Sequence, residues 1–144
     1  MGGRRRSWRE KLEAHKEPRI LKLLIPGSAD IEGLVSKIPE GKLLTDAQIK
    51  EHLKALYGVD VVCAKVLGIQ LRLLAEAAEE EALESGEPSV PYWRVIKRDG
   101  ALFPNFPGGQ EAQAERLRKE GHTIERGRGR RLRVRDFERY LVAL

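Results

Sequence analysis

The stretch that decides the fold reads TDAQIKEHLKALYGVDVVCAKVLGIQLRLL and spans residues 45–74. Thr45 is a typical N-cap residue, and the apolar spacing after it predicts a helix that packs through Ile49, Leu53 and Leu56. The stretch therefore opens with one amphipathic helix.

A second helix is expected after a short turn at Gly58, where glycine readily adopts the left-handed conformation of a helix end. The pattern predicts that it begins at Asp60 or Val61 and ends around Ser85-Gly86. Its predicted packing residues are Val62, Val66, Ile69, Leu73 and Leu74.

Charge is divided along this second helix. Lys65 and Arg72 lie seven positions apart and share a face, whereas residues 75–87 hold six glutamates and no basic residue. An acidic C-terminal half opposes the helix dipole, so charge steering explains the pattern better than fold stability does. Two helices with a short turn and a basic face form a helix-turn-helix arrangement.

Residues 1–27 read as a basic N-terminal arm that contains GRRRSWR and ends at the break Pro26-Gly27. Ser28 is expected to cap a short helix, SADIEGLVSKI. The apolar face of that helix consists of Ile31, Leu34, Val35 and Ile38.

Downstream, VPYWRVI is expected to be extended and KRDGALFPNFPGG to be a loop. The helix QEAQAERLRKEG follows, with Gly121 as its C-cap. HTIERGRGRRLRVRD alternates polar and apolar residues around two glycines, as a β-hairpin does, and a last helix starts at Asp136.

The expected fold class is mainly α with a small β component. Residues 28–121 would form a winged helix-turn-helix DNA-binding domain, and residues 122–144 a basic hairpin and C-terminal helix. Residues 126–135 carry six arginines, and arginines on such a hairpin contact backbone phosphates without reading sequence. The arginines assigned to this role are Arg128, Arg130, Arg131 and Arg133.

The bulk properties narrow the function classes. The 144 residues fit one domain, and a net charge of +5 with basic ends favours an anionic polymer as partner. No apolar run approaches the ~20 residues of a membrane helix, and the N-terminus has no signal-peptide core, so a cytoplasmic monomer without membrane contact is expected. The single cysteine, Cys63, and the three histidines lack metal-ligand spacing, so neither a metal nor another cofactor is expected.

Five motifs in order resemble the C-terminal domain of alkylguanine-DNA alkyltransferases. They are KIPEGKLLT, AKVLGIQLR, VPYWRVIKRDG, FPGG and RLRKEG, and the resemblance runs from about Ile31 to Gly121. In that family a winged helix-turn-helix binds the minor groove, and an arginine finger replaces a flipped, alkylated guanine. The cysteine of a Pro-Cys-His-Arg motif then takes the alkyl group.

The resemblance places Tyr92 at the cysteine position and Trp93 at the histidine position. A phenol with a pKa near ~10 and no basic neighbour is a poor nucleophile, so alkyl transfer is not expected. The chain is in this respect similar to the non-catalytic alkyltransferase-like proteins, which bind alkylated DNA and flag it for excision repair. The resemblance also places Lys65 at the arginine finger and Asp46 at a tyrosine that crowds the phosphate during base flipping.

The same resemblance implies a base pocket. Tyr92 is expected to line it, with Trp93 packed beneath because alternation along a strand would put the two rings on opposite faces. Arg94 is expected to support the recognition helix. The loop RDGALFPNFPGG is similar to the family's pocket lid, and it contributes Asp99, Phe103 and Phe106.

These observations predict a non-enzymatic protein that binds double-stranded DNA with damaged or alkylated bases and that works with excision-repair proteins. Lys65 and Arg72 would face the groove. One alternative is a glycosylase or lyase in which Lys65 is the amine nucleophile or Asp60 activates water. A second is a regulatory or architectural DNA-binding protein without lesion preference, and a minor one makes Cys63 a relocated alkyl acceptor.

Overall fold

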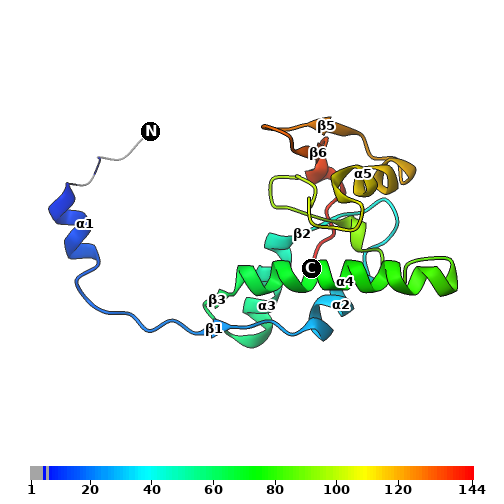
Figure 1. The fold of residues 1–144 in the computed structure, drawn as a ribbon. Helices are drawn as coiled ribbons and strands as arrows, with labels where there is room; N and C mark the ends of the chain where they lie inside the picture. The colour runs from blue at the N-terminus through cyan, green and yellow to red at the C-terminus, as the bar shows by residue number, and fades with distance from the viewer. Residues whose placement is uncertain (1–4, 6) are drawn as a thin grey trace.

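A computed structural model describes residue 5 and residues 7–144 of the chain. Arg4 and Arg6, which belong to the predicted basic arm, lie outside the described residues. Figure 1 shows a helical body with the longest helix running along one side, and a separate short helix at the N-terminal end. The helices are α1 (Trp8–Ala14), α2 (Ser28–Ser36), α3 (Asp46–Tyr57), α4 (Ala64–Ser85) and α5 (Gly109–Lys119), with two 3-10 turns, η1 (Tyr92–Arg94) and η2 (Phe137–Tyr140).

Short strands join distant parts of the described chain. β1 (Leu23–Leu24) pairs in parallel with β3 (Val61–Val62), and β2 (Leu44–Thr45) pairs in parallel with β4 (Val95–Ile96). β5 (Ile124–Arg126) and β6 (Leu132–Val134) form an antiparallel hairpin, the wing. The expected fold class, mainly α with a small β component and a winged helix-turn-helix, is confirmed.

The start of α3 is fixed by a capping box. The backbone N–H of Gln48 donates to Thr45 Oγ1 at 3.1 Å, and the Gln48 side chain accepts from the Thr45 N–H at 2.9 Å. At the other end, Gly58 has a φ of 61°, in the left-handed region. Both predicted ends of this helix are confirmed.

The expected start of the next helix is wrong, because α4 begins at Ala64 rather than at residue 60 or 61. The backbone of residues 61–62 is used in the pairing with β1, and Cys63 N–H donates to Leu24 O at 2.9 Å. Asp60 also serves this junction, since its Oδ2 accepts from Lys22 N–H at 2.8 Å. A long-range strand contact therefore delays the helix.

The predicted packing face of α4 is also wrong in part. Ile69 and Leu73 are 50% and 61% exposed, and Leu56 of α3 is exposed as well. Packing against α2 and η1 selects a neighbouring stripe of the helix, which consists of Leu67, Leu71, Ala75 and Ala78. Among the described residues, no helix combines the length and the apolar character that crossing a bilayer demands.

The segment expected to be an extended strand begins with a tight turn. Tyr92 N–H donates to Val90 O at 2.9 Å and Arg94 N–H to Pro91 O at 3.1 Å, so residues 92–94 coil as η1. Only the next two residues pair as a strand. The argument from strand alternation therefore does not apply to the two aromatic residues of this turn.

The last predicted helix is reduced to the 3-10 turn η2. Leu43 N–H donates to Tyr140 O at 2.9 Å, and Val142 N–H donates to Leu43 O at 2.9 Å. These bonds hold the final residues extended beside Leu43, so they cannot continue a helix. Two smaller differences are that Gly27, not Ser28, is the N-cap of α2 and that the C-cap of α5 is Glu120, one residue before Gly121.

The wing is joined to the loop that precedes α5. Leu102 N–H donates to Leu132 O at 2.9 Å, Val134 N–H donates to Gly100 O at 2.9 Å, and residue 101 bridges β6. Gly100 has a φ of 86°, and a Cβ there would lie 2.5 Å from the Phe137 ring. Glycine is thus required at this crossing.

Two hydrophobic clusters meet at Trp93, which packs against both. The larger cluster lies among α2, α3, α4 and η1. The smaller lies beneath the wing and α5, and it consists of Leu43, Ile96, Leu102, Ala114, Leu117, Val134 and Phe137.

Glu120 ties three segments together between the clusters. Its carboxylate accepts from Arg94 Nε at 2.9 Å, Trp93 Nε1 at 2.7 Å and Gly41 N–H at 2.9 Å. Arg94 also donates to Ile38 O at 2.6 Å. Burial by itself raises the pKa of Glu120, but the hydrogen bonds from Arg94, Gly41 and Trp93 outweigh it and hold the pKa below its ordinary value.

The capping box gives a first prediction. Thr45→Ala leaves the first turn of α3 without its side-chain acceptor and should lower the free energy of unfolding by about 1 kcal/mol in chemical denaturation. Ser28→Ala is the matched control, because Ser28 is the first residue of α2 and its hydroxyl forms no hydrogen bond with the described chain. Equal losses in both variants would contradict the role given to Thr45.

Glu120 gives a second prediction. The side chains of Arg94 and Glu120 are 14% and 7% exposed, so Glu120→Gln leaves a nearly buried guanidinium without its counter-charge and should cost about 3 kcal/mol at pH 7. Because the folded pKa of Glu120 is lowered, its stabilisation is complete above the ordinary pKa of 4.5 and is lost as the pH falls through the folded pKa.

The difference in unfolding free energy between the wild type and Glu120→Gln should therefore shrink from pH 5 towards pH 3. Denaturant titrations across this range measure it. Glu115→Gln, whose side chain is exposed, is the control and should change stability by less than about 0.5 kcal/mol. A pH-independent gap for Glu120→Gln would contradict the assignment.

Candidate nucleic-acid interface

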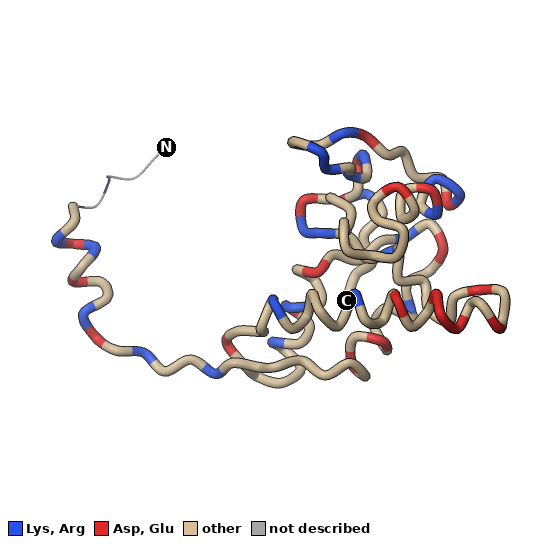
Figure 2. The backbone as a smooth tube through the Cα atoms, in the orientation of Figure 1, with Lys and Arg blue, Asp and Glu red and all other residues tan. Residues whose placement is uncertain are grey.

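The first half of α4 presents an uncompensated basic face. Lys65 and Arg72 are both exposed, and neither forms an ion pair with any residue that the structure describes. Figure 2 shows basic positions towards the start of this helix and acidic positions at its far end. Ile69 and Leu73 lie exposed between and beside the two cations. The face thus combines positive charge with apolar side chains.

The end of the N-terminal arm is held beside this face. Gln70 Nε2 donates to Pro26 O at 2.7 Å, and β1 pairs with β3 just before α4 begins. Further back, α1 has no buried residue and stands away from the body in Figure 1. The described part of the arm therefore includes a helix without buried residues, and only its last residues contact the start of α4.

The wing arginines fall into two groups. Arg128 and Arg130 are exposed and form no ion pair within the described chain. Arg131 lies 3.5 Å from an Asp99 oxygen, and Arg133 lies 2.9 Å from Glu125. One side of the wing borders a hollow of about 600 Å³ lined by Asp99, Ala101, Arg126, Gly127, Arg128, Arg131 and Arg133.

The aromatic residues of the expected base pocket pack on one another. Phe103 and Phe106 stack with ring centroids 4.4 Å apart, and Phe106 meets the Tyr92 ring edge-on at 5.5 Å. All three are buried, and Tyr92 is only 3% exposed. The structure brings these three predicted residues together, but it leaves little ring surface for a ligand.

Tyr92 is a buried, neutral hydrogen-bond donor. Its hydroxyl donates to Glu79 at 2.5 Å, and Glu79 also pairs with Arg116 at 2.6 Å. Burial, with the Glu79 hydrogen bond adding to it, raises the pKa of Tyr92 far above its ordinary value of 10. A phenol held in this state cannot supply a phenolate nucleophile near neutral pH.

The other three predicted pocket residues lie at two places outside this stack. Trp93 is half-buried and lines a different hollow of about 580 Å³, where the Arg116 guanidinium lies 4.6 Å from the ring centroid. Arg94 lines the same hollow, where its guanidinium pairs with Glu120 at 2.9 Å and lies 5.5 Å from the Trp93 ring centroid. Asp99 lies on the wing side and pairs with Arg131.

Several basic residues at the surface hollows were missed by sequence reasoning. Arg126 lines hollows on both sides of the wing, although it belongs to the same arginine run as the four residues that were chosen. Lys50, Lys97 and Arg98 surround Asp46 in a small hollow of about 250 Å³. The turn of residues 97–99 is recognisable in the sequence as basic, but its proximity to α3 depends on the pairing of β2 with β4.

The residues named for the glycosylase or lyase and for the alkyl-acceptor alternatives do not form a common site in the structure. Asp60 accepts a backbone hydrogen bond from the arm, and Cys63 is the half-buried N-cap residue of α4. Lys65 is exposed, and no carboxylate pairs with it in the described chain. Within residues 7–144, no group of three or more histidine, cysteine or acidic side chains is placed to hold a metal ion.

The sequence matches no protein-family model and no curated protein sequence. The structure does resemble two crystal structures from S. pombe. One is Atl1 in complex with damaged DNA containing O6-carboxymethylguanine, with a TM-score of 0.58 and 22% identity over 81% of this chain and 94% of that chain. The other is ATL in complex with DNA, with a TM-score of 0.59 and 20% identity over the same shares. The chain therefore has the fold of S. pombe Atl1.

Proposed function

We propose that this chain is a non-enzymatic DNA-binding protein that recognises alkylated or otherwise modified bases in DNA repair. The observation that carries the proposal is a fold shared with S. pombe Atl1, which was crystallised with damaged DNA, together with an unpaired basic face on the helix-turn-helix. Free cations on an exposed helix supply the salt-dependent affinity that phosphate contacts give.

In this proposal Lys65 and Arg72 of α4 face the groove. Ile69 and Leu73, exposed on the same side of the helix, would contact the sugar surface, because minor-groove proteins commonly combine cations with apolar contacts. The acidic end of α4 stays away from the phosphates. This division explains why the helix tolerates glutamates at the end where the dipole disfavours them.

On the wing, Arg128 and Arg130 are the first candidates for phosphate contacts, because the structure already pairs Arg131 and Arg133 with carboxylates. The Arg131 pair is exposed on both sides, so a phosphate can replace Asp99 there at little cost. Arg133 would serve chiefly to position the hairpin.

Lesion reading is assigned to Tyr92 and the loop of residues 99–106. Because Tyr92, Phe103 and Phe106 are packed together, a flipped base can enter only when the loop moves and the Phe103–Phe106 stack opens. Asp99 lies at the start of that loop. Arg94 holds η1, the turn that carries Tyr92, in place through its ion pair with Glu120. Trp93 lies next to Tyr92, 5.4 Å between ring centroids, and would sense the opening.

The absence of catalysis in this proposal rests on Tyr92. Its hydroxyl is protonated and engaged with Glu79, so it cannot accept an alkyl group as the thiolate of an alkyltransferase does. In this proposal the protein binds duplex DNA as a monomer and marks the lesion for excision-repair proteins.

Binding to DNA is tested by salt titration on matched duplexes with and without one O6-alkylguanine. The wild type should prefer the alkylated duplex, and Lys65→Gln/Arg72→Gln should weaken binding to both and reduce the salt slope by about 2. Arg118→Gln, an exposed arginine on α5, is the control. Equal affinity for the two duplexes would leave a lesion-independent DNA-binding protein, and a flat salt response would reject DNA binding.

Opening of the aromatic cluster is tested by tryptophan fluorescence in a Trp8→Phe background, which leaves Trp93 as the reporter. The emission should change on adding the alkylated duplex and stay nearly constant with the plain duplex, because only base entry separates the rings around Tyr92. The same change with both duplexes would contradict lesion-dependent opening.

A further inference from the structure

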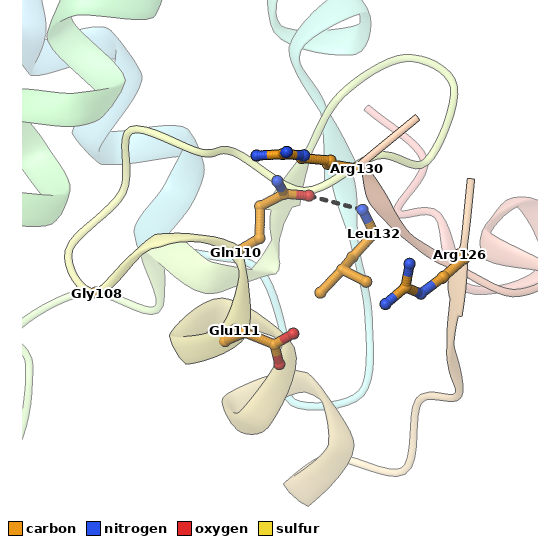
Figure 3. Close-up of a pocket in the computed structure, with 6 residues that line it drawn as sticks. All are labelled: Gly108, Gln110, Glu111, Arg126, Arg130 and Leu132. Carbon is orange, nitrogen blue, oxygen red and sulfur yellow. Dashed lines mark hydrogen bonds between the residues drawn. The ribbon is translucent and has the colours of Figure 1, made fainter. Parts of the chain in front are cut away.

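Another hollow lies between the wing and the start of α5. Its volume is about 480 Å³, and Figure 3 shows that it is bordered by the hairpin on one side and by the first turn of α5 on the other. The residues that line it are Gly108, Gln110, Glu111, Arg126, Arg130 and Leu132. The role described above for the wing does not use Arg126 or Gln110.

Two guanidinium groups at this hollow lack counter-charges. Arg126 and Arg130 are exposed, and neither forms an ion pair or hydrogen bond with the described chain. The neighbouring Arg133 and Arg135 differ, because both pair with Glu125. Guanidinium groups without counter-charges that line a concave surface are suited to bind a planar or tetrahedral oxyanion through paired N–H donors.

Gln110 adds a neutral donor whose orientation is fixed. Its Oε1 accepts from Leu132 N–H at 2.7 Å, so the amide oxygen must face β6. The NH₂ group then points away from β6, and Figure 3 shows it directed towards the Arg130 side chain. No described residue accepts a hydrogen bond from it. The hollow thus offers an amide donor beside two guanidinium groups.

The charge of the hollow indicates which oxyanion it suits. Glu111 contributes one carboxylate, so two guanidinium groups leave a net charge of about +1. A phosphodiester carries a single negative charge and balances it, whereas a terminal phosphate carries nearly two and would leave the hollow with a net negative charge. A phosphodiester of a nucleic-acid backbone matches this charge best.

We propose that the hollow between the wing and α5 binds one backbone phosphodiester of duplex DNA through Arg126, Arg130 and Gln110. The site is additional to the α4 face, and it rests on the proposed function, since it needs the chain to bind DNA. Arg133 belongs to the supporting structure: its bonds to Glu125 and to the Asp99 carbonyl hold the hairpin that presents the site.

The test compares salt titrations of the full chain on one plain duplex. Arg126→Gln/Arg130→Gln removes both guanidinium groups from exposed positions and should weaken binding about tenfold and lower the salt slope by about 0.9, the value for one phosphate. Arg118→Gln should leave affinity and slope unchanged. Thermal unfolding of each variant confirms that the fold is retained.

A second readout locates the contact. In NMR titrations of the wild type with the duplex, the Gln110 side-chain NH₂ signals should shift, and in Arg126→Gln/Arg130→Gln the shift should be lost. If the wild type binds with a steep salt slope but the double variant keeps the same slope, or if the Gln110 signals do not move, the site is refuted and DNA binding stands. If the wild type shows no salt-dependent binding, both proposals are refuted.

Discussion

The carboxylate of Glu120 is the constraint on which the rest of the structure depends. It accepts hydrogen bonds from the turn before β2 and, within η1, from the Trp93 indole and the Arg94 guanidinium, so it joins two separate parts of the chain to the end of α5. These bonds fix η1 against the end of α5. Because Tyr92 begins η1, the position of the whole aromatic cluster depends on one buried ion pair.

The charged residues of this molecule differ in whether they form ion pairs as well as in sign. Cations that are at least partly buried, such as Arg94, Arg116 and Arg133, have carboxylate partners and hold elements together. Cations of the α4 face and the wing tip have none in the described chain. The electrostatic field of an unpaired cation is not reduced by a neighbouring carboxylate. The surface able to attract a polyanion is therefore smaller and more sharply defined than the net charge suggests.

Sequence reasoning succeeded where the determinants are local. The N-cap at Thr45, the helix end at Gly58 and the glycine-rich hairpin are each encoded within a few residues, and the structure has all three. It failed where distant backbone groups decide the outcome. Pairing with β1 delays α4, and hydrogen bonds to Leu43 keep the C-terminal residues out of a helix.

The candidate site was only partly predictable for the same reason. The arginine run predicted a phosphate-binding wing, but which of its arginines lack an ion pair depends on the positions of Glu125 and Asp99. Whether Tyr92 lines a cavity depends on Phe103 and Phe106, whose packing no local pattern reveals.

The backbone hydrogen bonds between β6 and residues 100–102 have a consequence for motion. They attach residues 100–102 of the loop to β6 through an isolated bridge and two backbone hydrogen bonds, so displacement of the hairpin is transmitted to the loop through the backbone instead of through flexible side chains. In the proposed base recognition, opening would then be a collective movement of one segment, which belongs to microseconds or slower, and not a rotation of single side chains within nanoseconds.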